Sequence, residues 1–217
     1  MKLDLLRVVE RCTQFAASLI QNFCTYQEGE NVTNFDLAGK SAVVITTNYG
    51  TEQDELTYPI NALRAAGAHV TIAAQRKEPV HTLRSDKNPG EVINPETTIK
   101  AVTSADYDLL LIPGGTVNSD ILRLDESAQQ LVTSFAEAGK PIAAICHAPW
   151  LLVETGVVKG RTMTSVAMVR TDVINAGAEW IDQAVVVDVD GPFRLITSRN
   201  PNDLEDFATE IKRTLAS

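Results

Sequence analysis

The chain has 217 residues, of which 44% are hydrophobic and 22% are charged, and this composition is typical of one globular domain of ordinary size. The formal net charge of −9 disfavours contact with phosphate backbones and anionic lipids, so we expect neither nucleic acid nor a membrane as a partner. No segment approaches the roughly 18–20 apolar residues of a membrane span, and charged residues interrupt the N-terminus where a signal peptide would be apolar.

The three cysteines show no metal-type spacing, so we expect free thiols, no metal and a cytoplasmic location.

Residues 1–30 repeat apolar side chains at three- and four-residue steps, which predicts an amphipathic helix. Its apolar stripe would either pack on its own domain or cover a subunit interface, and both alternatives remain open. The stretch "EGENVTNFDLAGK" that follows predicts a polar linker. We therefore expect residues 1–40 to form an N-terminal helical extension and residues 41–217 to form the main domain.

From residue 41 onward, short β-branched and apolar runs alternate with segments of helical periodicity. Strands are expected at 41–47, 69–74, 107–115, 140–146 and 161–165, and a hairpin at 184–198. Helices are expected at 52–67, 119–139, 147–156, 167–177 and 200–217, and residues 75–104 should hold turns and a hairpin.

This alternation predicts a mostly parallel sheet with helices on both faces, which is a three-layer α/β/α sandwich. Ligands bind such sheets beyond the carboxyl ends of the strands. Cys146 and the pair Gly114–Gly115 both follow strands, so they should lie at this edge.

Cys146 lies within "AAICHAPWLL", between a predicted strand and a predicted helix. Ala144 and Ala148 flank it as small residues, a pattern similar to the G-x-S-x-G turn that exposes a nucleophile. Such a turn would hold the thiol in a position that favours the thiolate. The alternative is an inert core cysteine beside an incidental histidine.

Backbone N–H groups after the strand at 107–115 are candidate oxyanion donors. We assign this role to Gly115 and His147, and we place Gly114 and Ala148 among the substrate- or oxyanion-binding positions. Glu55, in the predicted helix after the first strand, is a candidate partner for the thiol, although acidic residues also commonly occupy a first helical turn.

The histidines limit the mechanism. No histidine follows His147 in the chain, so the arrangement of a glutamine-hydrolysing amidotransferase, in which the histidine lies well beyond the cysteine, is excluded. His147 is therefore the candidate base.

The segments "AICHAPWLLVETGVVKGR", "NAGAEWIDQAVVVD" and "LITSRNPNDL" resemble the PfpI intracellular protease and protein deglycase family of the class I glutamine amidotransferase-like superfamily. The resemblance implies a flavodoxin-like fold and a cytosolic homodimer or higher oligomer. It also implies a Cys146 nucleophile, a Glu55 contact to the thiol, and oxyanion donors at Gly115 and His147, with no cofactor.

One stretch departs from the family pattern. Family proteases carry P-G-G-x-A-P-E, whereas this chain has "PGGTVNSDILRL". Aligning "LRLDE" places Asp120 where the family glutamate reaches the histidine of a neighbouring subunit. The prediction is that Asp120 takes this role, with a shorter side chain.

Two classes of function are therefore open. The first is an enzyme that uses Cys146, His147 and Glu55 on a reactive carbonyl, on a glycated or unfolded protein, or on another acyl substrate, with glyoxalase or deglycase chemistry. The second is a redox-sensing or holdase stress protein with an oxidisable Cys146. A peptidase is the further alternative, and it depends on Asp120.

Overall fold

The computed structural model describes residues 35–217, and a seven-stranded sheet forms its centre. The strand order is β11-β12-β8-β7-β1-β3-β6, and every neighbouring pair is parallel except β11 and β12. The strands are β1 (Ser41–Thr46), β3 (His69–Ala74), β6 (Thr97–Thr98), β7 (Leu109–Ile112), β8 (Ile142–Ile145), β11 (Val185–Asp188) and β12 (Leu195–Ser198).

Alternating side chains of the central strands supply two separate apolar cores, one on each face of the sheet. Val43 and Ile45 of β1 belong to one core, and Ala42 and Val44 belong to the other. Strands that are buried on both faces read as continuous apolar runs, which explains why "LLLI" and "IAAI" form β7 and β8. The predicted three-layer sandwich is confirmed.

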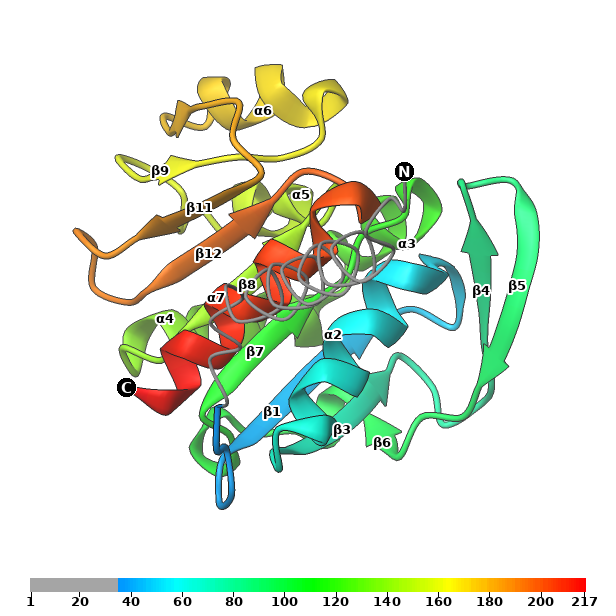
Figure 1. Ribbon diagram of the computed structural model, residues 1–217. Coiled ribbons are helices and arrows are strands. Elements are labelled where there is room, and N and C mark those ends of the chain that lie inside the picture. The colour runs from blue at the N-terminus through cyan, green and yellow to red at the C-terminus, as the bar shows by residue number, and fades with distance from the viewer. Residues whose placement is uncertain (1–34) are drawn as a thin grey trace, which may run out of the picture. The chain divides into compact units, whose positions relative to one another are not determined.

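Helices cover both faces. On one side lie α2 (Gln53–Ala65) and α7 (Leu204–Ala216), which run side by side in front of the sheet in Figure 1. The other core contains side chains from α3 (Thr116–Leu122), α4 (Glu126–Glu137), α5 (Pro149–Glu154) and α6 (Arg170–Asn175).

A smaller sheet stands beside the carboxyl edge of the central one. It has the order β2-β4-β5, formed by β2 (Tyr49–Glu52), β4 (Val80–Arg84) and β5 (Asn88–Ile93). The hairpin expected within residues 75–104 is thus confirmed as β4–β5, whereas β2 was not predicted. The tight turn between β4 and β5 places Ser85 and Asp86 at positive φ, 54° and 57°.

The helix expected at 119–139 is wrong as a single element, because the chain divides it into α3 and α4. The break comes at Asp125, which is the N-cap of α4. Its side chain accepts hydrogen bonds from the N–H groups of Ser127 at 2.9 Å and Ala128 at 3.1 Å.

The strand expected at 161–165 forms as β9 (Thr162–Met163). It pairs with β10 (Glu179–Trp180) in a separate two-stranded sheet and not with the central sheet.

The described chain begins within the predicted linker. Leu37 is fully buried in the core beneath α2 and α7, and its N–H donates to the Ala66 carbonyl at 2.7 Å. Residues 35–40 therefore pack as part of the domain. The predicted N-terminal helix at 1–30 lies outside the described residues.

Candidate active site

Cys146 occupies the turn between β8 and α5, at the carboxyl edge of the sheet. Its φ is +64°, a conformation that is costly for a residue with a side chain. The backbone is held there from two sides, since its N–H donates to the Ser198 carbonyl at 3.0 Å and its own carbonyl accepts from Val166 N–H at 3.1 Å. The side chain is buried, with 7% exposed.

Glu55 in the first turn of α2 faces the same thiol. Its side chain is completely buried, and its Oε2 accepts a hydrogen bond from Gly114 N–H at 2.9 Å. Gly114 lies between the two groups, because a Cβ placed on it would come within 2.6 Å of Glu55 Oε2 and 2.8 Å of Cys146 Cβ. Only glycine at this position lets the carboxyl approach the thiol so closely.

Glu55 and Cys146 perturb each other's proton affinity. Burial raises the pKa of Glu55 from 4.5 to about 8, and the proximity of the Cys146 thiol and the Gly114 N–H partly opposes this rise. Burial also raises the pKa of the Cys146 thiol, and the charge of Glu55 adds to the increase. Two adjacent buried anions are unfavourable, so the two groups titrate as a coupled pair in which both stay protonated until the pH approaches 8.

Two backbone N–H groups oppose this effect at the sulfur. The backbone N–H groups of Gly115 and His147 lower the pKa of Cys146, so both amides lie near enough to the sulfur to favour a negative charge on it. Gly115 has a φ of +89°, and a Cβ on it would lie 2.4 Å from the Gly50 carbonyl oxygen. The position therefore requires glycine.

The two other positions predicted to bind the substrate or the oxyanion, Gly114 and Ala148, have occupied amides. The N–H of Gly114 holds Glu55, and that of Ala148 donates to the Ile145 carbonyl at 3.0 Å. Both residues shape the site through their small size, and their N–H groups are not available to an oxyanion.

His147 contacts the sulfur directly. Its Nδ1 lies 3.2 Å from Cys146 Sγ, and the side chain is 5% exposed. Its Nε2 lies 3.3 Å from Thr116 Oγ1, which in turn is 2.8 Å from Asp86 Oδ2. Burial lowers the pKa of His147, while the charge of Asp86 acts in the opposite direction. The imidazole is therefore neutral at physiological pH.

Sequence reasoning missed Thr116 and Asp86. Thr116 directly follows the glycine pair, and Asp86 lies in the hairpin segment "SDKNPGE", which indicated only a turn. The fold brings the hairpin tip against the start of α3.

Asn118 is the third residue that was missed, and it is completely buried. Its Oδ1 accepts hydrogen bonds from Thr47 N–H at 2.8 Å and Thr46 Oγ1 at 3.0 Å. Its Nδ2 donates to the carbonyls of Pro113 at 3.1 Å and Gly114 at 3.0 Å. One amide thus ties the end of β1 to the Gly114–Gly115 pair.

Asp120 lies exposed on α3, and within residues 35–217 it makes no hydrogen bond with His147. It borders a surface cavity with Ile121 and Leu124, two apolar residues that are also exposed. The predicted role of Asp120 concerns a neighbouring subunit, and it stays a prediction.

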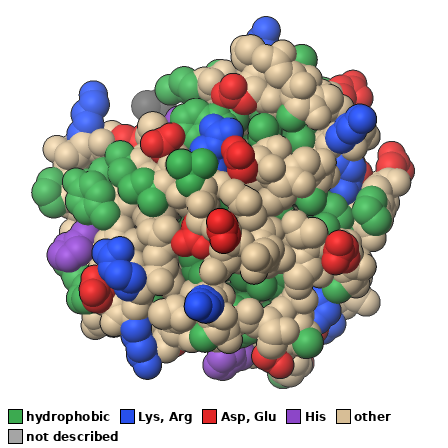
Figure 2. All heavy atoms as spheres, turned by 180° about the vertical axis from the view of Figure 1, so that it is seen from behind, with side chains coloured by type: hydrophobic (Ala, Val, Ile, Leu, Met, Phe, Trp, Pro, Cys, Tyr) green, Lys and Arg blue, Asp and Glu red, His purple; other side chains and the backbone are tan. Residues whose placement is uncertain are grey.

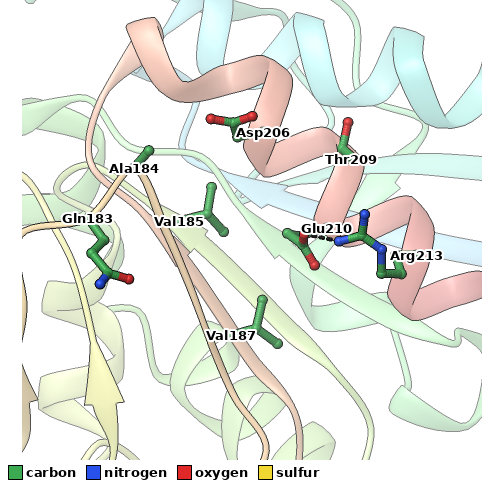
Figure 3. Close-up of a pocket in the computed structure, with 8 residues that line it drawn as sticks. All are labelled: Gln183, Ala184, Val185, Val187, Asp206, Thr209, Glu210 and Arg213. Carbon is green, nitrogen blue, oxygen red and sulfur yellow. Dashed lines mark hydrogen bonds and ion pairs between the residues drawn. The ribbon is translucent and has the colours of Figure 1, made fainter. Parts of the chain in front are cut away.

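A surface cavity of about 500 Å³ lies between β11 and α7, away from Cys146. Figure 3 shows its lining, in which Glu210 pairs with Arg213 on the same helix. None of the predicted site residues contributes to it.

Charged side chains of both signs are scattered among apolar ones on the face shown in Figure 2. Within residues 35–217, no cluster of three or more His, Cys, Asp or Glu side chains is arranged to hold a metal ion. The helices of this part of the chain are all too short or too polar to cross a bilayer.

Comparison with known proteins identifies the family. Residues 40–214 match the DJ-1/PfpI family. "Protein/nucleic acid deglycase 2" of Escherichia coli is 40% identical over 181 residues, which cover 83% of this chain and 100% of the relative. "Putative cysteine protease YraA" of Bacillus subtilis is 37% identical over 175 residues, which cover 80% of this chain and 96% of the relative.

Among solved structures, Drosophila melanogaster DJ-1beta superposes with a TM-score of 0.72 at 34% identity, covering 82% of this chain and 90% of that one. The family match over residues 40–214 covers nearly all of the described residues and includes the strand–turn–helix segment around Cys146. The chain belongs to the DJ-1/PfpI family.

Proposed function

We propose that this protein is a cysteine-dependent enzyme that acts on reactive carbonyls, namely α-oxoaldehydes such as methylglyoxal and the adducts they form with amines. The observation that supports this most is the setting of Cys146. Its thiol lies at a positive-φ turn between the Glu55 carboxyl and His147 Nδ1, and the N–H groups of Gly115 and His147 favour a negative charge on the sulfur. These groups are the ones that a thiol needs to add to a carbonyl carbon.

In the first step, the sulfur of Cys146 bonds to the aldehyde carbon and the thiol proton passes to His147 Nδ1. The carbonyl oxygen takes the negative charge next to the Gly115 and His147 amides, and it is then protonated to give a hemithioacetal. A carbinolamine adduct reaches the same intermediate when the sulfur displaces the amine, which leaves with the thiol proton.

In the second step, Glu55 in its ionised form removes the proton on the former aldehyde carbon and returns it to the adjacent carbon. The hydroxyl proton meanwhile moves to the oxygen of that adjacent carbon. The aldehyde carbon is thereby oxidised and its neighbour reduced, so no external redox cofactor is needed. The product is a thioester of a 2-hydroxy acid, which water hydrolyses to release lactate in the case of methylglyoxal and to restore the thiol.

The burial of the site favours small substrates. Cys146 is 7% exposed and His147 is 5% exposed, so a two- or three-carbon carbonyl reaches the sulfur more readily than a folded polypeptide does. The E. coli relative is named for deglycation of protein and nucleic acid. We propose glycated protein as the macromolecular substrate, because the net charge of −9 opposes nucleic acid. A cytoplasmic homo-oligomer without a cofactor completes the proposal.

The experiment is an assay of lactate formation from methylglyoxal by the wild-type protein and by the Cys146→Ala variant. The matched control is the Cys12→Ala, Cys24→Ala double variant, which leaves Cys146 as the one remaining cysteine of the chain. We expect the control to keep its activity and Cys146→Ala to lose it. Equal lactate production by wild type and Cys146→Ala would refute the proposal.

A redox-sensing role is the second candidate, and the contact between Glu55 and the thiol supports it. Peroxide would oxidise the Cys146 thiolate first to a sulfenate and then, with a second equivalent, to a sulfinate, and one water would be released at each step. A protonated Glu55 could donate a hydrogen bond to that sulfinate.

Mass spectrometry after mild peroxide treatment tests this role: Cys146 should gain two oxygen atoms before Cys12 or Cys24 is oxidised. A peptidase, the activity in the name of the B. subtilis relative, would additionally need Asp120 to act on a neighbouring subunit. Hydrolysis of an unfolded protein by wild type and its loss in Asp120→Asn would support that role.

A further inference from the structure

A chain of hydrogen bonds leads from the sulfur of Cys146 to the hairpin turn β4–β5. Cys146 Sγ contacts His147 Nδ1, His147 Nε2 contacts the Thr116 hydroxyl, and that hydroxyl contacts Asp86 Oδ2. The second oxygen of Asp86, Oδ1, accepts the backbone N–H of Thr116 at 2.7 Å. Asp86 therefore binds Thr116 through both of its carboxylate oxygens.

The number of available protons determines the direction of each bond. A carboxylate can only accept hydrogen bonds, and the hydroxyl of threonine has a single proton. Because Thr116 donates that proton to Asp86, its oxygen can only accept from His147. The proton of the neutral imidazole must then reside on Nε2, which leaves the lone pair of Nδ1 directed at Cys146.

We propose that Asp86 is a positioning residue that acts through Thr116 to fix the tautomer of His147, so that Nδ1 is a proton acceptor toward Cys146. The inference rests on the proposed function for its catalytic consequence, although the tautomer itself is a property of the resting protein. The acid that orients His147 is thus Asp86 of the same chain, whereas the sequence prediction assigned this role to Asp120 of a neighbouring subunit.

The local structure holds Asp86 in place for this role. Both oxygens of Glu52 accept hydrogen bonds from the turn, one from Ser85 N–H at 3.1 Å and the other from Asp86 N–H at 3.2 Å. Ser85 and Asp86 both have a positive φ, a conformation that is maintained only when surrounding contacts stabilise it. The hairpin tip is therefore a fixed support and not a free loop end.

The charged and titratable groups around His147 are few. The Cys146 thiol and the Asp86 carboxylate face it through the bonds described above. The Trp150 ring packs with its centroid 5.3 Å away, and the guanidinium of Arg123 stacks on that indole. Asp86 is thus the carboxylate whose charge acts on the His147 pKa.

The replacement Asp86→Asn reverses the order of donors. The backbone N–H of Thr116 still needs an acceptor, so the amide oxygen of the asparagine takes that place and its NH₂ group faces the Thr116 hydroxyl. The hydroxyl then accepts from the asparagine and donates its proton to Nε2. The imidazole proton moves to Nδ1, where it points at the sulfur, and the shape of the site is preserved.

The experiment records the ¹⁵N chemical shifts of His147 at pH 8, where the ring is neutral. A background with His69→Gln and His81→Gln, two exposed positions, leaves His147 as the one histidine of the chain. We expect the Nε2–H tautomer in the background protein and the Nδ1–H tautomer in Asp86→Asn. Thr116→Val should give a mixture, and Thr116→Ser, which keeps the hydroxyl, should restore Nε2–H.

Methylglyoxal turnover is measured on the same samples. A wrong tautomer should lower kcat by about 10²-fold or more, as general-base catalysis contributes on this scale, with Thr116→Ser close to the background value. An unchanged Nε2–H tautomer in Asp86→Asn, or Nδ1–H in the background protein, would overturn the inference. If Asp86→Asn fails to fold, the pair Thr116→Val and Thr116→Ser decides it by the same spectra.

The two readouts separate the inference from the function. Correct tautomers with no turnover in the background protein would refute the enzyme and leave the positioning role intact. Turnover that persists in variants with the wrong tautomer would refute the catalytic consequence of the inference.

Discussion

Replacing Glu55 by glutamine tests the electrostatics of the site through the stability of the whole domain. The carboxyl is completely buried and carries a pKa of about 8 in the fold, against 4.5 as a model value for the unfolded chain. Glutamine keeps the shape and the acceptor for Gly114 N–H, but it does not titrate.

The sign follows from proton binding. Below pH 4.5 the carboxyl is protonated in both states, and its contribution to stability is fully present. Between pH 4.5 and about 8 the unfolded chain releases the proton while the folded protein retains it, so the wild type loses stability as pH rises. At about 1.36 kcal/mol per pH unit, this interval corresponds to a loss of up to about 5 kcal/mol.

The assay is urea unfolding at several pH values from 4.5 to 8, followed by the fluorescence of Trp150 and Trp180. We expect the stability of Glu55→Gln relative to wild type to increase across this range by several kcal/mol. Glu78→Gln, at an exposed position, is the matched control and should follow the wild type at every pH.

A constant difference between Glu55→Gln and wild type from pH 4.5 to 8 would refute the reasoning. It would mean that Glu55 titrates alike in the folded and unfolded states, and that its burial beside Cys146 does not raise its pKa.

Two further substitutions test the support of the site. Gly115→Ala combines a φ of +89° with a Cβ 2.4 Å from the Gly50 carbonyl oxygen. Urea unfolding should therefore show a decrease of at least about 1–3 kcal/mol in the free energy of unfolding, and methylglyoxal turnover should fall sharply. Unchanged stability and turnover would contradict this. Asn118→Ala leaves buried donors on Thr46 and Thr47 without their acceptor. We expect the free energy of unfolding to fall by roughly 3 kcal/mol or more. An unchanged free energy of unfolding would show that the Asn118 amide does not hold the glycine pair.

The strands and the position of Cys146 could be predicted because their signals are local. An apolar run such as "LLLI" forms a strand whose two faces are both buried. The small residues Ala144 and Ala148 on either side of Cys146 permit a sharp turn. Glu55, Gly115 and His147 followed from the resemblance to a known family together with the expectation that strand ends meet at one edge.

The contacts of Thr116, Asp86 and Asn118 are not local. Asp86 reaches Thr116 across 30 residues of sequence, and Asn118 reaches Thr47 across 71. An aspartate in a tight turn ordinarily stabilises that turn alone, so its pattern carries no sign of a distant partner. The break between α3 and α4 was missed for a related reason, since Asp125 fits the periodicity of one long helix as well as the cap of a second.

The central claim is that the chemistry takes place on the sulfur of Cys146, and titration of this thiol against activity tests it most directly. In the Cys12→Ala, Cys24→Ala background, iodoacetamide is added in increasing amounts, and the alkylated fraction of Cys146 is measured by mass spectrometry alongside methylglyoxal turnover. The account predicts that turnover falls in proportion to the alkylated fraction and disappears when alkylation is complete. Lactate formation that persists with Cys146 fully alkylated would contradict it.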